Sequence, residues 1–111
     1  DEQLEDIRQK MLEIERYVEQ GLPRTVPEQA FHNALATATH NSYMSKLIPI
    51  LNRSIEEVVD KLDETTDIID TSLADHRLIV EMMSSRNASG AKAAMYVHMC
   101  HAFNTAGFNI D

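Results

Sequence analysis

Four side chains of the types that ligate metals occur in this 111-residue chain at spacings that favour a shared site: Glu28, His32, His76 and His98. Because Glu28 and His32 are four residues apart, a helix stacks both side chains on one face. His76 and His98 each lie in register with apolar residues at helical spacing, so we expect both to point inward. An unpartnered polar group in an apolar interior costs roughly 1–3 kcal/mol. One divalent metal shared by the four side chains removes that cost.

Three neutral imidazoles and one carboxylate suit a divalent transition metal, with zinc as first choice and nickel, manganese or iron as alternatives. Each residue also has a simpler interpretation when it is taken singly. A histidine can be a satisfied core residue or a surface group. Glu28 can be the closing acid of a capping box that begins at Thr25. His101, three residues after His98, can hydrogen-bond to the ligand residues or be exposed.

The elements that must position these side chains are helices. Apolar residues recur at alternating three- and four-residue steps from Leu4 to Val18, and Gly21 with Pro23 ends this amphipathic segment. Further helices are predicted over about residues 25–39, 42–62 and 69–85, and from the turn at 86–90 to about 105. No segment alternates with period two for long enough to indicate a strand. We therefore predict an all-α fold, a single antiparallel bundle of about five to six helices with a central cavity for metal and ligand.

Length and charge argue against several classes of protein. A chain of 111 residues suits one domain, spanning 1–111. Eighteen acidic residues against ten basic ones give a net charge of −8 without a Lys/Arg cluster, so direct DNA binding is not expected. The least charged segment, from Ala88 onward, is broken by Lys92 and His98, and residues 1–20 are charged throughout, so neither a membrane span nor a signal peptide is expected. Cys100 is the single cysteine, which favours a reducing, cytoplasmic setting.

Three segments carry motifs whose order and separation are typical of one family. Residues 28–35, EQAFHNAL, are similar to an acid, two variable residues, Phe-His, a small residue and leucine. Asn41 follows where that family usually has an asparagine between helices. Residues 75–79, DHRLI, resemble its acid-His segment, and residues 91–98 its closing Ala, Met and His pattern. Over about residues 28–101 the chain thus resembles the FCD-type effector domain of the FadR subfamily of GntR transcription regulators.

This resemblance implies that Glu28, His32, His76 and His98 hold a metal, commonly zinc, at the bottom of a helical-bundle cavity. The family commonly has aspartate at the first position, and the extra methylene of Glu28 moves the carboxylate by about one bond length. The resemblance also implies an upstream winged-helix domain that reads DNA, which we expect to be absent from this chain. We therefore expect either an excised effector domain or a regulator that has lost DNA binding.

The effector that the resemblance implies is a small organic or sugar acid, with its carboxylate at the metal and the rest held by the cavity wall. The candidate wall residues are Arg53, Asn33 and Asn104, and a solvated Arg53 is the alternative. Effector binding is expected to shift the bundle between two arrangements in a homodimer, and a separate winged-helix domain reads that shift on DNA. No membrane partner and no catalysis are expected.

Two other functions compete with this interpretation. A metal-dependent hydrolase fits a site with open metal positions, but the general base that it needs is not apparent, because Glu28 is already assigned to the metal. The second is a metal-free helical interaction or dimerisation module, in which the stripe from Leu4 to Val18 packs on a partner and the histidines fill the core. Turnover assays and the metal content of the purified protein separate these alternatives.

Overall fold

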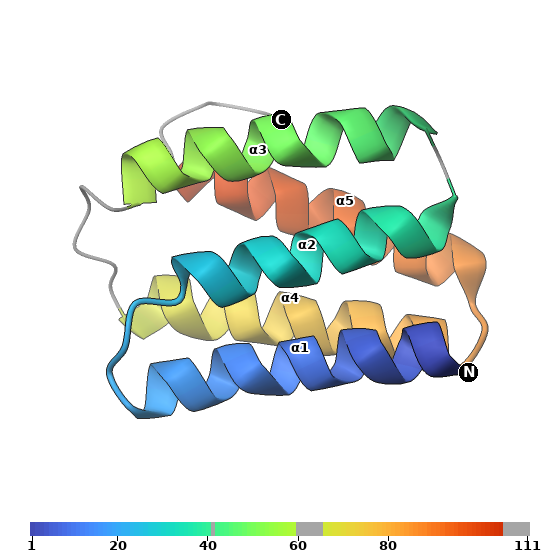
Figure 1. Cartoon of the computed structure of the whole chain (residues 1–111), viewed down its shortest axis with the longest axis horizontal. Helices are drawn as coiled ribbons and strands as arrows, with labels where there is room; N and C mark the ends of the chain where they lie inside the picture. The colour runs from blue at the N-terminus through green and yellow to red at the C-terminus, as the bar shows by residue number, and fades with distance from the viewer. Residues whose placement is uncertain (41, 60–65, 106–111) are drawn as a thin grey trace. The chain divides into compact units, whose positions relative to one another are not determined.

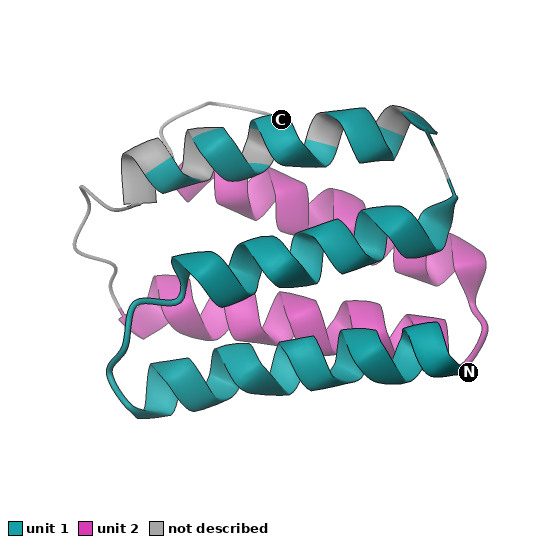
Figure 2. Ribbon diagram, in the orientation of Figure 1, with its two compact units in different colours: residues 1–60 teal, residues 61–111 magenta. Residues whose placement is uncertain are grey.

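A computed structural model describes residues 1–40, 42–59 and 66–105, and all elements in these ranges are α-helices (Figure 1). The five helices are α1 (Glu2–Glu19), α2 (Thr25–Thr39), α3 (Ser42–Val59), α4 (Thr66–Ser84) and α5 (Ala88–Thr105). The predicted all-α class is therefore confirmed. The chain divides into two compact units, residues 1–60 with α1 to α3 and residues 61–111 with α4 and α5 (Figure 2). Successive helices run antiparallel within each unit (Figure 1).

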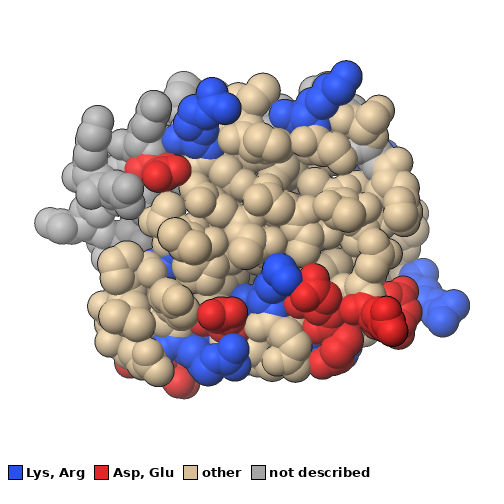
Figure 3. Space-filling view, in the orientation of Figure 1, with Lys and Arg blue, Asp and Glu red and all other residues tan. Residues whose placement is uncertain are grey.

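Helix α1 forms as its apolar stripe predicts. Asp1 caps it, because the Asp1 Oδ1 accepts a hydrogen bond from the Leu4 amide at 3.1 Å. Ile7, Met11 and Ile14 are buried on one face of the helix. On the face that Figure 3 shows, charged side chains gather over α1. Within this helix, Arg8 pairs with Glu5 and Lys10 pairs with Asp6. These exposed pairs contribute little to stability, whereas burial of the apolar stripe drives the packing of α1 on α2.

Helix α2 is the central helix of the first unit, because it packs on both α1 and α3. Phe31 and Leu35 are buried on α2, and Ile48 is buried on α3. The turn before α2 contains Gly21 at φ 69°, a conformation that glycine adopts without a steric cost. The structure thus positions Glu28 and His32 on a helix that is fixed from two sides.

The start of α2 differs from the predicted capping box. Arg24 occupies the N-cap position without a side-chain capping bond, and Thr25 is already helical. The Glu28 carboxylate pairs with the Arg24 guanidinium, one helical turn away. A charge-assisted bond to arginine is stronger than a neutral bond to a backbone amide, which explains why this pairing replaces the capping box.

Helix α2 ends at Thr39, and the next residue, His40, has a φ of 54°, the left-handed conformation common after a helix. The predicted break at His40–Asn41 is confirmed at His40, whereas Asn41 lies outside the described residues. Helix α3 begins at Ser42 and includes Pro49.

The second unit is a hairpin in which α4 packs on α5. Its turn contains Arg86 at φ 58°, and the Asn87 Oδ1 accepts a hydrogen bond from the Gly90 amide at 2.8 Å. Asn87 thus caps α5, as the polar segment 86–90 predicts. Helix α4 begins at Thr66, three residues earlier than the predicted Ile69, and the acidic Asp67 in its first turn favours that start. Among the described helices, none is long and apolar enough to cross a membrane.

Candidate metal centre

Glu28 and His32 form a buried carboxylate–imidazole pair on α2. The Glu28 Oε2 lies 3.5 Å from the His32 Nε2, and the two residues are 7% and 3% exposed. Two ligands of one tetrahedral zinc lie roughly 3.3 Å apart, because each bond to the metal is about 2.0–2.1 Å long. The separation exceeds the usual range for an N–H···O hydrogen bond, about 2.7–3.2 Å. The pair is therefore spaced as two ligands of one ion are spaced.

Arg24 holds the other carboxylate oxygen of Glu28. Its Nη1 donates to the Glu28 Oε1, and both side chains are almost buried. One guanidinium thus compensates the negative charge of the carboxylate and orients it, so that Oε2 is the oxygen that faces His32. Sequence reasoning missed Arg24, although its place four residues before Glu28 is the spacing of a helical ion pair.

A second polar contact orients the imidazole of His32 from α3. The His32 Nδ1 lies 2.8 Å from the Asn52 Oδ1, and the Asn52 Nδ2 donates to the Asn33 Oδ1 at 3.1 Å. Asn52 is 7% exposed and was not among the predicted site residues. The available signal was its place four residues after the apolar Ile48, which puts the polar side chain of Asn52 on the same face of α3 as Ile48.

In the second unit, α4 and α5 bring His76 and His98 together. Their ring centroids are 4.7 Å apart at an interplanar angle of 72°, and the residues are 0% and 4% exposed. Two imidazoles bound to one tetrahedral zinc have ring centres roughly 5 Å apart. The predicted inward direction of both histidines is confirmed by their burial.

One carboxylate oxygen of Asp75 forms hydrogen bonds with two imidazoles. Its Oδ2 lies 3.0 Å from the His98 Nδ1 and 2.8 Å from the His101 Nδ1. Burial raises the pKa of Asp75, but hydrogen bonds from His98 and His101 outweigh burial, so this pKa lies below its ordinary value of 3.8. The side chain of His101 is about half exposed and also hydrogen-bonds to this carboxylate. Both predicted interpretations of His101, an exposed residue and a hydrogen-bonding neighbour of the site, therefore apply.

The candidate effector residues lie on helix surfaces. Arg53, Asn33 and Asn104 are exposed on α3, α2 and α5, and the exposure of Arg53 fits the alternative of a solvated arginine. Asn33 makes the hydrogen bond to Asn52 described above. Whether any of the three contacts an effector stays a prediction.

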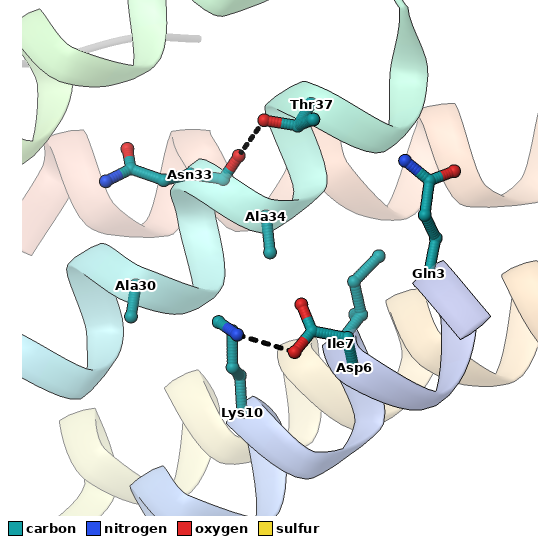
Figure 4. A pocket seen from close by; sticks show the side chains of 8 residues that line it. All are labelled: Gln3, Asp6, Ile7, Lys10, Ala30, Asn33, Ala34 and Thr37. Carbon is teal, nitrogen blue, oxygen red and sulfur yellow. Dashed lines mark hydrogen bonds and ion pairs between the residues drawn. The ribbon is translucent and has the colours of Figure 1, made fainter.

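A hollow of about 360 Å³ opens between α1 and α2 (Figure 4). The small side chains of Ala30 and Ala34 leave this space, and the ion pair of Lys10 and Asp6 forms part of its wall. The full lining is Gln3, Asp6, Ile7, Lys10, Ala30, Asn33, Ala34 and Thr37. Glu28 and His32 do not line it, so this hollow is distinct from the predicted metal site.

The fold and these residues define a class of protein. Glu28, His32, His76 and His98 are all buried and of types that could hold a metal ion, and helical domains commonly build ligand and metal sites from such inward side chains. A family model described as FCD domain matches residues 1–101, and the chain belongs to this family. FCD domains are the C-terminal effector-binding domains of GntR-family regulators, so this chain is a ligand-sensing regulatory domain. No curated protein and no solved structure matches the chain.

Proposed function

We propose that this domain senses a small carboxylate effector at one divalent metal ion held by Glu28, His32, His76 and His98, in a regulator of the FadR subfamily. The observation that carries the proposal is the buried Glu28–His32 pair, whose 3.5 Å separation matches the spacing of two zinc ligands. The buried His76–His98 pair supplies two further imidazoles with a matching ring separation. Zinc suits this donor set first, and nickel, manganese or iron are alternatives.

Different residues of this protein would orient the ligands of such a site and contact its effector. A bound metal supplies a positive centre with positions left for the carboxylate of the effector. Arg24 turns the Glu28 Oε2 toward His32, and Asp75 holds the His98 Nδ1. Arg53, Asn33 and Asn104 are the candidates for contact with the rest of the acid. Acid binding changes the equilibrium between two arrangements of a homodimer, which a separate winged-helix domain reads on DNA.

The direct test is the metal content of purified protein after dialysis, measured by elemental analysis. We expect about one zinc per chain in the wild type and none in His76→Ala or His98→Ala, because each variant removes an imidazole ligand. His40→Asn is the matched control, since His40 is exposed and asparagine tolerates its left-handed backbone. Metal retained in both alanine variants contradicts the proposed ligand set.

The effector is tested with the same protein. A panel of small mono- and dicarboxylic acids and sugar acids is scanned by thermal shift, first with zinc bound and then after chelation. We expect stabilisation by at least one acid with zinc and its loss after chelation, because the acid binds at the metal. Equal stabilisation in both states contradicts binding at the metal.

A metal-free helical interaction module is the second candidate. It is favoured by the polar partners that Glu28 and His32 already have in Arg24 and Asn52, because these contacts reduce the cost of burial without an ion. The exposed apolar side chains of Tyr96 and Val97 on α5 also suit a protein partner. The test is the metal content of wild-type protein after growth and dialysis in zinc-containing medium. Absence of bound metal would favour the interaction module over the metal-dependent sensor.

A further inference from the structure

The buried Asn52 of α3 forms hydrogen bonds with two residues of α2, the candidate metal ligand His32 and the exposed Asn33. Its Oδ1 is 2.8 Å from the His32 Nδ1, and its Nδ2 donates to the Asn33 Oδ1 at 3.1 Å. Only 7% of the residue is exposed, so its amide forms hydrogen bonds with protein groups and not with bulk water.

The donor and acceptor directions of these hydrogen bonds determine which nitrogen of His32 carries the proton. A neutral imidazole has one N–H donor and one acceptor nitrogen. Because the Asn52 Nδ2 donates to Asn33, the Asn52 Oδ1 is turned toward His32 and accepts from the Nδ1–H. The acceptor lone pair is then on Nε2, the nitrogen that faces the Glu28 Oε2 at 3.5 Å.

The contact with Glu28 agrees with this direction. An Nε2–H that donated to the carboxylate would draw the two atoms to about 2.7–3.2 Å, and they are 3.5 Å apart. The other oxygen of the carboxylate is engaged by Arg24. Glu28 and His32 therefore present an oxygen and a nitrogen lone pair toward the same region, and a cation is the group that both would bind.

We propose that Asn52 is a positioning residue that holds His32 in the Nδ1–H tautomer, so that its Nε2 is ready to ligate a metal. The proposal rests on the function proposed above and extends it to a residue outside the ligand set. Partners that accept the second N–H of a ligating histidine fix its ring orientation, and their loss typically lowers metal affinity about 10–100-fold. Asn33 accepts a hydrogen bond from the Asn52 amide and so holds that amide in its orientation.

Two variants separate this role from simple packing of α3 on α2. Asn52→Leu keeps the branched shape and the number of heavy atoms of the side chain and removes the acceptor, whereas Asn52→Asp keeps an acceptor oxygen at the same place. The matched control is Gln29→Ala, because the Gln29 Nε2 also bonds across from α2 to α3, to the Glu56 Oε2 at 2.9 Å, without contacting His32.

The first readout is the tautomer of His32 in metal-free protein, from ¹⁵N chemical shifts and long-range ¹H–¹⁵N couplings of the imidazole. We expect Nδ1–H in the wild type, Asn52→Asp and Gln29→Ala, and a shift toward Nε2–H in Asn52→Leu. The second readout is zinc affinity from competition with a chromophoric chelator. We expect a loss of about 10–100-fold in Asn52→Leu and affinity near the wild type in Asn52→Asp and Gln29→Ala.

The outcomes distinguish this proposal from the function on which it rests. A wild type that binds no zinc overturns the proposed function before any variant is made. Zinc binding by the wild type with equal affinity in Asn52→Leu, or with His32 as Nε2–H in the wild type, overturns the positioning role alone. Equal losses of affinity in Asn52→Leu and Gln29→Ala assign Asn52 to helix packing and also overturn it.

Discussion

Arg24 and Glu28 form a nearly buried ion pair across the first turn of α2, with side chains 12% and 10% exposed. The same carboxylate faces His32 with its other oxygen, so the pair connects the stability of α2 with the candidate metal centre. A carboxylate in this environment depends on nearby positive charge, which either the guanidinium or a bound metal can supply.

Arg24→Met should therefore destabilise the metal-free protein by about 3 kcal/mol, because it removes the guanidinium from a buried carboxylate. The loss should be smaller with saturating zinc, since the metal supplies positive charge at Glu28. Urea unfolding with chelator and with zinc measures both values. Arg8→Ala is the control, because its ion pair with Glu5 is exposed and contributes less than about 1 kcal/mol. Equal losses of stability in the two variants would show that the Arg24–Glu28 pair contributes no more than an exposed ion pair.

Zinc should stabilise the wild type by linkage, because the ion binds the folded state. At a zinc concentration 100-fold above its Kd the expected gain is about 2.7 kcal/mol, seen as a rise in Tm that excess chelator reverses. His98→Ala should lose this gain, whereas His40→Asn should keep it. A zinc-dependent rise of equal size in His98→Ala contradicts ligation by His98.

Acid should remove the contribution of Asp75 to stability. The pKa of Asp75 is lowered in the folded protein, so folding favours the ionised form. This contribution is complete above the ordinary value of 3.8 and is lost as the pH falls below it toward the lowered folded-state pKa. Asp75→Asn should therefore be less stable than the wild type at pH 7, and the difference should shrink by pH 3.

Urea unfolding of chelated protein at the two pH values measures this difference. Asp70→Asn is the control on the same helix, because Asp70 is exposed, and its difference from the wild type should be small at both pH values. A difference for Asp75→Asn that is the same at pH 7 and pH 3 contradicts the role of the ionised carboxylate.

The turn between α4 and α5 offers a stabilising substitution. Arg86 has φ 58°, a left-handed conformation that costs a residue with a Cβ about 1 kcal/mol and that glycine adopts freely. Arg86→Gly should raise the free energy of unfolding by up to about 1 kcal/mol, measured by urea or thermal unfolding. Lys92→Gly in the exposed interior of α5 should lower it by about the same amount. A loss of stability in both variants contradicts the assigned backbone conformation.

Local patterns in the sequence were enough to predict the helices. The bounds of α2 and the end of α5 were predicted correctly, because each depends on residues within one or two turns of the chain. The same locality explains the Glu28–His32 pair, since a separation of four residues on one helix leaves only the side-chain rotamers undecided. The start of α4 was predicted three residues late, because the helix begins with the polar Thr66 and Asp67, which carry no apolar periodicity.

Tertiary structure decided the partners of these side chains. Asn52 meets His32 from a position 20 residues away, and Asp75 meets His98 and His101 from 23 and 26 residues away. Such contacts depend on the rotation and register of one helix against the next, which periodicity in a single helix does not specify. The sequence by itself therefore determined an all-helical chain with inward histidines, whereas the packing of α3 on α2 and of α5 on α4 decided which nitrogen of His32 and His98 is held by a neighbour.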